Sequence, residues 1–235
     1  MSDINPPQLP TQDLITAPAG SFSYQPRTQT ELRSLLELCD VYRRFIPNLS
    51  GLTTPLLILL EEGQPFKLEP LDRLQREAIA TLVGEVINPP VLAPPQANLP
   101  YAVDAEGSRD QANVALFQVA GQERLPVGFW SRPLSVSERS YSAVEKEGLP
   151  IFWALEVLRP YLQGSHFTVY TDSRMVPWLM TDPNPRGPLR RWRHLLAELE
   201  FTIVCEGTET VYSTEVSTDT QPGVNRRKRR KTITE

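Results

Sequence analysis

Residues 166–172 read HFTVYTD, a short run of β-branched and aromatic side chains that leads directly into an aspartate. Such a run predicts a buried β-strand. Similar runs lie before and after it, separated by turn residues and by two stretches with apolar side chains at helical spacing. The expected strands cover residues 101–104, 113–119, 126–131, 166–171 and 201–205. The expected helices cover residues 142–158, which Ser142 and Glu145 open as a capping box, and residues 189–199. This order predicts a mixed α/β domain over about residues 98–220.

Upstream of this domain, residues 28–97 are expected to form a small helical module followed by a proline-rich linker. Thr28 and Glu31 have the spacing of a capping box, which predicts the start of a first helix. Pro55 follows a threonine, a pattern typical of the first residue of a second helix. A third helix is expected after Pro70.

Both ends of the chain have the composition of extended segments. Residues 1–27 are rich in proline, serine, threonine and glutamine, and they predict a disordered leader. Residues 221–235 form a basic tail that contains six consecutive bases, Arg226 to Lys231. This run fits a solvated tail, a nuclear-import signal or salt-sensitive contact with nucleic acid. Without it, residues 1–224 carry 18 basic and 27 acidic side chains, so overall charge does not favour phosphate binding by the body.

Composition excludes several classes of protein. The longest apolar run, residues 56–60, is far shorter than the roughly 20 residues that span a bilayer. The polar N-terminal segment has no apolar signal core. The two cysteines, Cys39 and Cys205, form neither a disulfide framework nor the paired motifs of a structural zinc site. We therefore expect an intracellular protein, cytoplasmic or nuclear, without a membrane partner and with both thiols reduced.

Three acidic side chains of the α/β domain are candidates for a metal site. Asp104 ends the first expected strand, Glu147 lies in the first expected helix, and Asp172 ends the fourth expected strand. Magnesium prefers carboxylate oxygens, and a pair of ions can activate water and stabilise the leaving oxygen in phosphodiester cleavage. Spacing alone is a weak signal here, because most of the 28 acidic residues of a chain like this are simply solvated.

Nine short motifs occur in a fixed order along residues 28–216. They are YRRFIPN (42–48), NPPVL (88–92), GFWSRPL (128–134), ERSYS (138–142), EKE (145–147), WAL (153–155), LRPYL (158–162), FTVYTD (167–172) and LRRW (189–192). In order and approximate spacing they resemble the end of the polymerase and the RNase H domain of gypsy-type LTR retrotransposon polyproteins. The resemblance implies an RNase H-like mixed sheet with flanking helices, preceded by a thumb or connection module.

The resemblance also implies a chemistry, namely Mg²⁺-dependent hydrolysis of the RNA strand of RNA–DNA hybrids. Asp104, Glu147 and Asp172 match three of the four catalytic carboxylates of that family, which hold the metal. No Tyr-x-Asp-Asp sequence occurs in the chain, so it carries no polymerase active site. Any DNA synthesis would require a separate polymerase chain as a partner.

The sequence departs from the family pattern at the predicted site, and the turn from Asp104 to Asn113 is two residues longer than in the family, with Asn113 at the position of a glycine. Thr214 occupies the position of the fourth catalytic aspartate, and a hydroxyl is a poor magnesium ligand beside a carboxylate. Glu215 or Asp219 could substitute for the missing ligand. Pro150 lies inside the helix that carries Glu147, where proline deletes a backbone hydrogen bond at a cost of about 3 kcal/mol. Cleavage is therefore expected to be weakened or lost.

The basic residues of the body gather on one predicted helix. Arg190, Arg191 and Arg193 lie off its apolar face, where they are either solvated or in contact with phosphate. The resemblance favours contact with an RNA–DNA hybrid or another nucleic acid. The alternative to an enzyme is a non-catalytic remnant of a retroelement polyprotein that binds nucleic acid or another protein.

Overall fold

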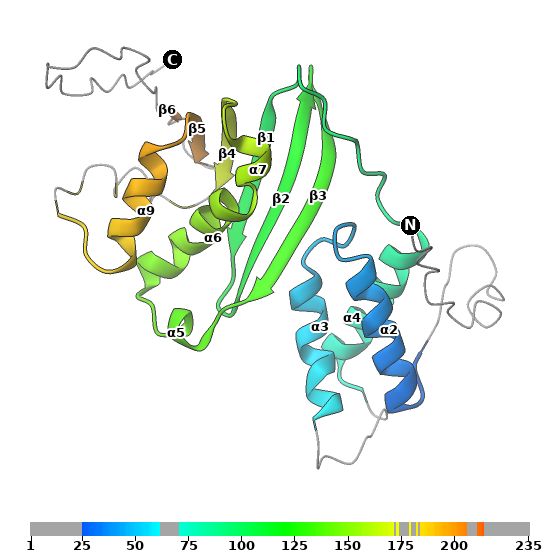
Figure 1. Ribbon diagram of the computed structural model, residues 1–235. Coiled ribbons are helices and arrows are strands. Elements are labelled where there is room, and N and C mark those ends of the chain that lie inside the picture. Colours follow the sequence, from blue (N-terminus) through cyan, green and yellow to red (C-terminus); the bar gives the residue numbers. More distant parts are fainter. Residues whose placement is uncertain are drawn as a thin grey trace, which may run out of the picture. The chain divides into compact units, whose positions relative to one another are not determined.

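The chain, described here from a computed structural model, forms two compact units (Figure 1). The structure describes residues 25–61, 71–171, 173, 179, 182, 184–205 and 211–213. Described residues up to Val91 belong to the first unit together with Phe129–Arg132, and the others belong to the second. Most of the expected leader and the whole basic tail lie outside the described residues.

The first unit is helical, as the sequence predicts. Its helices are α2 (Gln29–Val41), α3 (Leu49–Leu57), the short 3-10 helix η1 (Ile58–Leu60) and α4 (Arg73–Ile87). Thr28 caps α2, since its hydroxyl accepts a hydrogen bond of 3.2 Å from the amide of Glu31. The carboxylate of Glu31 in turn accepts from the amide of Arg27 at 2.6 Å, one residue before the cap. The expected start of the first helix is therefore confirmed.

A single apolar core holds the first unit together. Its fully or nearly fully buried side chains come from all three α-helices and the segments beside them. They are Leu32, Leu35, Cys39, Ile46, Leu49, Leu56, Leu71, Ala78, Ile79, Leu82 and Val83. Burial raises the pKa of the Cys39 thiol to about 12, and a backbone hydrogen bond lowers it by less. At neutral pH this thiol is protonated and buried, as an inert structural cysteine is.

The expected start of the second helix is wrong. Helix α3 begins at Leu49, so Pro55 lies inside it instead of at its first position. The chain enters α3 through Asn48, which has a left-handed φ of 50°, and the Asn48 carbonyl accepts from the amide of Leu52 at 3.2 Å. Within the helix the hydroxyl of Thr54 donates to the carbonyl of Ser50 at 2.7 Å, so Thr54 is not the helix cap.

The second unit is built on a mixed sheet of six strands, one of which, β3, also contains Phe129–Arg132 of the first unit. They are β1 (Tyr101–Gly107), β2 (Gln111–Ala120), β3 (Glu123–Pro133), β4 (Phe167–Thr171), β5 (Phe201–Cys205) and β6 (Val211–Ser213). The strand order is β3-β2-β1-β4-β5-β6. Strand β1 pairs antiparallel with β2 and parallel with β4, β4 pairs parallel with β5, and β5 pairs antiparallel with β6. The predicted mixed α/β fold is confirmed, with β6 as an addition.

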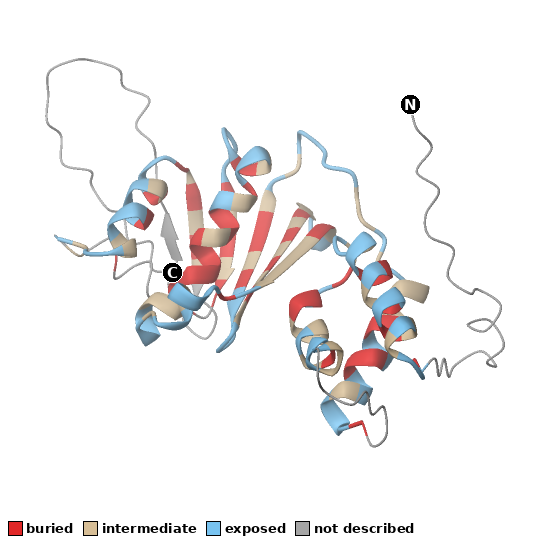
Figure 2. Cartoon of the chain, turned by 60° about the horizontal axis from the view of Figure 1, so that its bottom comes forward, coloured by how far each residue is buried: buried red, intermediate tan, exposed pale blue. Residues whose placement is uncertain are grey.

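One long helix covers a face of this sheet. The helices of the second unit are α5 (Val136–Arg139), α6 (Ala143–Val157), α7 (Arg159–Leu162) and α9 (Pro188–Ala197). Helix α6 packs on β1 and β2 and is flanked by α7 and α9 (Figure 1). Its Phe152 stacks on Trp192 of α9, with ring centroids 4.4 Å apart. Buried residues lie along the strands and on parts of the helices (Figure 2). Among the described residues, no helix is long and apolar enough to cross a membrane.

Pro150 does not interrupt the helix that carries Glu147. Helix α6 starts with the expected capping box of Ser142 and Glu145 and continues through Pro150 to Val157. The Pro150 ring is buried, and it packs where Gly107 of β1 has no side chain. A Cβ on Gly107 would lie 2.9 Å from Pro150 Cγ and 3.4 Å from the Lys146 carbonyl oxygen. Gly107 and Pro150 are therefore complementary in shape. The sequence alone did not predict that they contact each other.

A buried glutamine of the sheet forms hydrogen bonds with the proline-rich linker. Gln118 of β2 is fully buried, and its side-chain oxygen accepts a hydrogen bond of 2.8 Å from the amide of Gln96. Its amide nitrogen donates to the carbonyls of Gln96 and Leu99 at 2.7 and 3.2 Å. One side chain thus satisfies three backbone groups of a segment that has no regular partner strand.

Candidate catalytic and nucleic-acid-binding sites

Asp104 lies in the middle of a strand and not at its end, because β1 continues to Gly107. In the sheet Asp104 is opposite Ala115 of β2 and Tyr170 of β4. Side chains alternate between the two faces of a strand, and Gly107 faces α6. Asp104, an odd number of residues away, therefore points to the face that α6 does not cover.

The carboxylate of Asp104 already has a cationic partner. Arg124 of β3 reaches across β2 and places its Nη2 atom 2.5 Å from Asp104 Oδ1. The guanidinium carbon lies 4.2 Å from the centroid of the Phe117 ring and 5.0 Å from that of Tyr170. The side chains of Arg124 and Asp104 are 39% and 28% exposed, so the pair is only partly shielded from water.

Arg124 is the site residue that the sequence did not reveal. It lies at the start of β3, and Asp104 lies on β1, two strands away in the sheet order. No local motif connects the two residues. The alternation of side chains along the strands is the signal that could have found it, because this alternation places Phe117 on the same face as Asp104. Using the signal requires the register between β1 and β2, which only the folded sheet provides.

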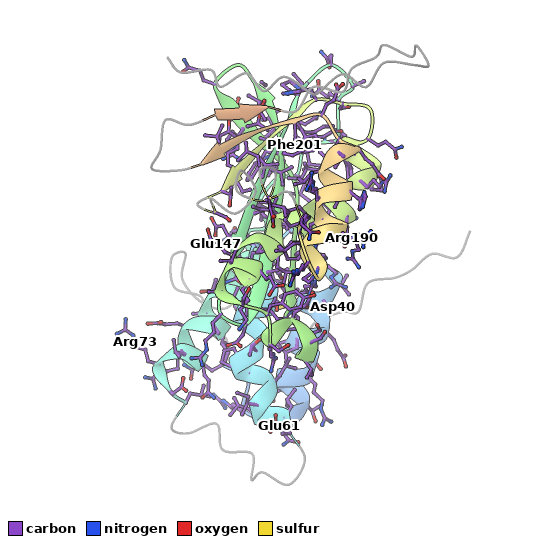
Figure 3. All side chains as sticks on the ribbon, turned by 90° about the vertical axis from the view of Figure 1, so that its left-hand side faces the viewer. Asp40, Glu61, Arg73, Glu147, Arg190 and Phe201 are labelled. Atoms are coloured by element: carbon purple, nitrogen blue, oxygen red, sulfur yellow. The ribbon has the colours of Figure 1, made fainter. Side chains whose placement is uncertain are left out.

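Glu147 is on α6, the helix that covers the opposite face of the sheet from Asp104. In Figure 3 the labelled Glu147 lies on α6 and the labelled Arg190 on α9, on opposite sides of the view. Asp172, the third predicted ligand, lies outside the described residues, and so do Thr214, Glu215 and Asp219.

The described carboxylates do not form a metal site. Within the parts of the chain that the structure describes, no group of three His, Cys, Asp or Glu side chains could hold a metal ion. Asp104 is engaged by a guanidinium, and Glu147 belongs to α6, the helix that packs on the other face of β1. Asp104 and Glu147, the two described members of the predicted set, do not by themselves supply the several carboxylates that a two-magnesium centre needs, and the complete set stays a prediction.

The predicted basic face of α9 divides into two parts. Arg190 and Arg193 line a groove together with Arg186 and His194, and we call these four residues the basic groove. Arg191 instead forms an ion pair of 2.7 Å with Glu156 of α6. Helical geometry explains the division, since residues three or four apart share a face and neighbouring residues do not. The side chains of the basic groove are exposed, as a site for an extended ligand requires.

Comparison with known proteins matches the second unit to one family. Residues 96–222 match the model of the RNase H-like domain found in reverse transcriptase. The chain is 34% identical over 178 residues to the Retrovirus-related Pol polyprotein from transposon 297 of Drosophila melanogaster, which covers 76% of this chain and 16% of the relative. It is 30% identical over 184 residues to the Transposon Tf2-3 polyprotein of Schizosaccharomyces pombe, and this match covers 76% of this chain and 14% of the relative. The chain thus spans a small part of these relatives.

Solved structures show the same fold. The foamy viral protease-reverse transcriptase in complex with double-stranded DNA has a TM-score of 0.58 and 22% identity, covering 80% of this chain and 40% of that one. The same enzyme in complex with an RNA/DNA hybrid has a TM-score of 0.58 and 21% identity, and the match covers 89% of this chain and 28% of that one. The sheet topology, the motifs and the family match agree with one another. The chain therefore belongs to the family of RNase H-like domains found in reverse transcriptases, as carried by LTR retrotransposon polyproteins.

Proposed function

We propose that this chain is an RNase H-like domain that binds RNA–DNA hybrids and whose Mg²⁺-dependent cleavage of the RNA strand is weakened or lost. One observation carries the proposal, namely the 2.5 Å contact between Arg124 and Asp104. In the ancestral enzyme Asp104, Glu147 and Asp172 would hold the magnesium ions. Here one of these carboxylates has a protein cation as its partner, and the position of the fourth aspartate holds Thr214.

Cleavage of a labelled hybrid tests the catalytic half of the proposal. We expect the natural protein with Mg²⁺ to cut the RNA strand very slowly or not at all. Asp104→Asn removes the charge that a metal would need, and it should leave this low rate unchanged. Cleavage by the natural protein that disappears in Asp104→Asn would show a working site and would contradict the proposal.

The basic groove supports the binding half. Arg186, Arg190 and Arg193 present guanidinium groups beside His194 on an exposed surface, and phosphate contacts of this kind give affinity without reading sequence. The related solved structures contain double-stranded DNA or an RNA/DNA hybrid. For this chain a hybrid is the proposed ligand, recognised by shape and by 2′-hydroxyl groups. The basic tail and a separate polymerase chain remain predicted contributors.

Replacing Arg190 and Arg193 by glutamine should weaken hybrid binding about tenfold at moderate salt. Each phosphate contact also contributes about 0.9 to the slope of log affinity against log salt concentration, so we expect the slope to become shallower by about 1 to 2. Fluorescence anisotropy with a labelled hybrid measures both quantities. The comparison is repeated in a chain that ends at Val224, because the basic tail adds salt-dependent binding of its own.

Arg191→Gln is the matched control for this prediction. It removes one positive charge from the same helix, half of what the double variant removes, but Arg191 is paired with Glu156 and does not line the basic groove. Its affinity and salt slope should stay close to those of the natural protein. A loss of log affinity in Arg191→Gln of half that in the double variant, or more, would mean that only net charge matters, and it would contradict a role for the groove.

A further inference from the structure

Arg124 is seated on the open face of the sheet by three partners on three different strands. It contacts the Asp104 carboxylate on β1, the Phe117 ring on β2 and the Tyr170 ring on β4. The two rings hold the guanidinium by cation–π attraction, which adds to the charge-assisted hydrogen bond. A side chain held on several sides is not a chance surface pair, because its position is fixed by packing as well as by charge.

The guanidinium occupies the space beside Asp104 Oδ1 that a metal ion on this oxygen would need. A divalent cation binding Asp104 Oδ1 must displace Arg124 from 2.5 Å, or it must bind beside a like charge. Both options cost free energy, because displacing Arg124 breaks its charge-assisted hydrogen bond to Asp104, and binding beside it brings two like charges close together. Asp104 is 28% exposed, so an ion can reach it from water once the guanidinium has moved.

We propose that Arg124 is a built-in counterion that excludes divalent cations from Asp104. The proposal rests on the proposed function, which places Asp104 at the former metal site, and it names the residue that keeps this site closed. Because Arg124 reaches Asp104 through its side chain, a single substitution removes the cation and leaves strand β3 and the carboxylate in place. The site is then open to a metal ion from solvent.

Binding of Mn²⁺, measured by its effect on water-proton relaxation, tests this role without any need for activity. Mn²⁺ accepts the same oxygen ligands as Mg²⁺. Arg124→Gln should bind Mn²⁺ on the order of tenfold more tightly than the natural protein, because a nearby like charge is gone. Arg124→Lys keeps a cation and should stay close to the natural affinity. Arg191→Gln, which breaks a 2.7 Å ion pair elsewhere in the same unit, should also leave it unchanged.

Asp104→Asn combined with Arg124→Gln should lose the added affinity, which locates the ion on this carboxylate. Equal Mn²⁺ affinity in Arg124→Gln and the natural protein overturns the counterion role, and so does a gain that persists without Asp104. The proposed function is judged separately by hybrid cleavage. An uncut hybrid with no change in Mn²⁺ affinity overturns only the role of Arg124, whereas an Asp104-dependent cut by the natural protein overturns the proposed function.

Discussion

Gln118→Leu is expected to lower the free energy of unfolding of the second unit by about 3 kcal/mol, since leaving buried polar groups unpaired costs about 1 to 3 kcal/mol each. Leucine has a similar volume, but it cannot replace the hydrogen bonds to Gln96 and Leu99. The melting temperature should fall by roughly 10 °C. Thermal unfolding followed by circular dichroism measures the change.

Gln122→Leu is the control for the same chemical change. Gln122 is exposed in the turn between β2 and β3, and this substitution should shift the melting temperature only slightly. Hydrogen exchange gives a second measurement, because the Gln96 amide should lose protection in Gln118→Leu while the amides of β1 keep theirs. A Gln118→Leu protein as stable as the natural one would show that the linker does not depend on this side chain.

Gly107→Ala is expected to destabilise the second unit by about 1 to 3 kcal/mol, the usual cost of adding volume to a packed site. The new methyl group would lie 2.9 Å from Pro150 Cγ, and the ring cannot move without the helix. Pro150→Ala removes the ring and restores the helix hydrogen bond, so the double variant should regain most of the loss. A double-mutant cycle should therefore give a coupling energy of about 1 to 2 kcal/mol.

Gly84→Ala is the matched control, and its expected effect on stability has the opposite sign. Gly84 lies inside α4, and nothing lies within 4 Å of the position of an added Cβ. Alanine there should stabilise its helix by roughly 0.5 to 1 kcal/mol. If Gly107→Ala and Pro150→Ala proved additive, the two residues would not be packed against each other, and the fit of α6 on β1 would need revision.

Much of the fold follows from local sequence signals. The capping boxes at Thr28 and Ser142 predicted where α2 and α6 begin, and both starts are confirmed. The β-branched run at residues 166–171 predicted β4 almost to the residue. Such signals work because the interactions that create them join residues a few positions apart.

The sequence failed where distant residues decide the outcome. Pro150 suggested a damaged helix, but Gly107 leaves room for its ring on a strand 43 positions away in the sequence. Arg124 had no motif, because its partnership with Asp104 depends on the order β3-β2-β1. The pattern at Thr54 and Pro55 fails for a local reason instead, because α3 already begins at Leu49, directly after the left-handed Asn48.

The central claim is that this domain binds an RNA–DNA hybrid without cutting it efficiently. A single-turnover experiment tests it most directly, with protein in excess over a hybrid labelled on the RNA strand and with Mg²⁺ present. Anisotropy reports the bound fraction, and gel electrophoresis of the same samples reports cleavage. We predict that the RNA strand of the bound hybrid stays intact. The cleavage rate of the natural protein should be indistinguishable from that of Asp104→Asn. Rapid cutting of the bound RNA strand that is lost in Asp104→Asn would contradict the account.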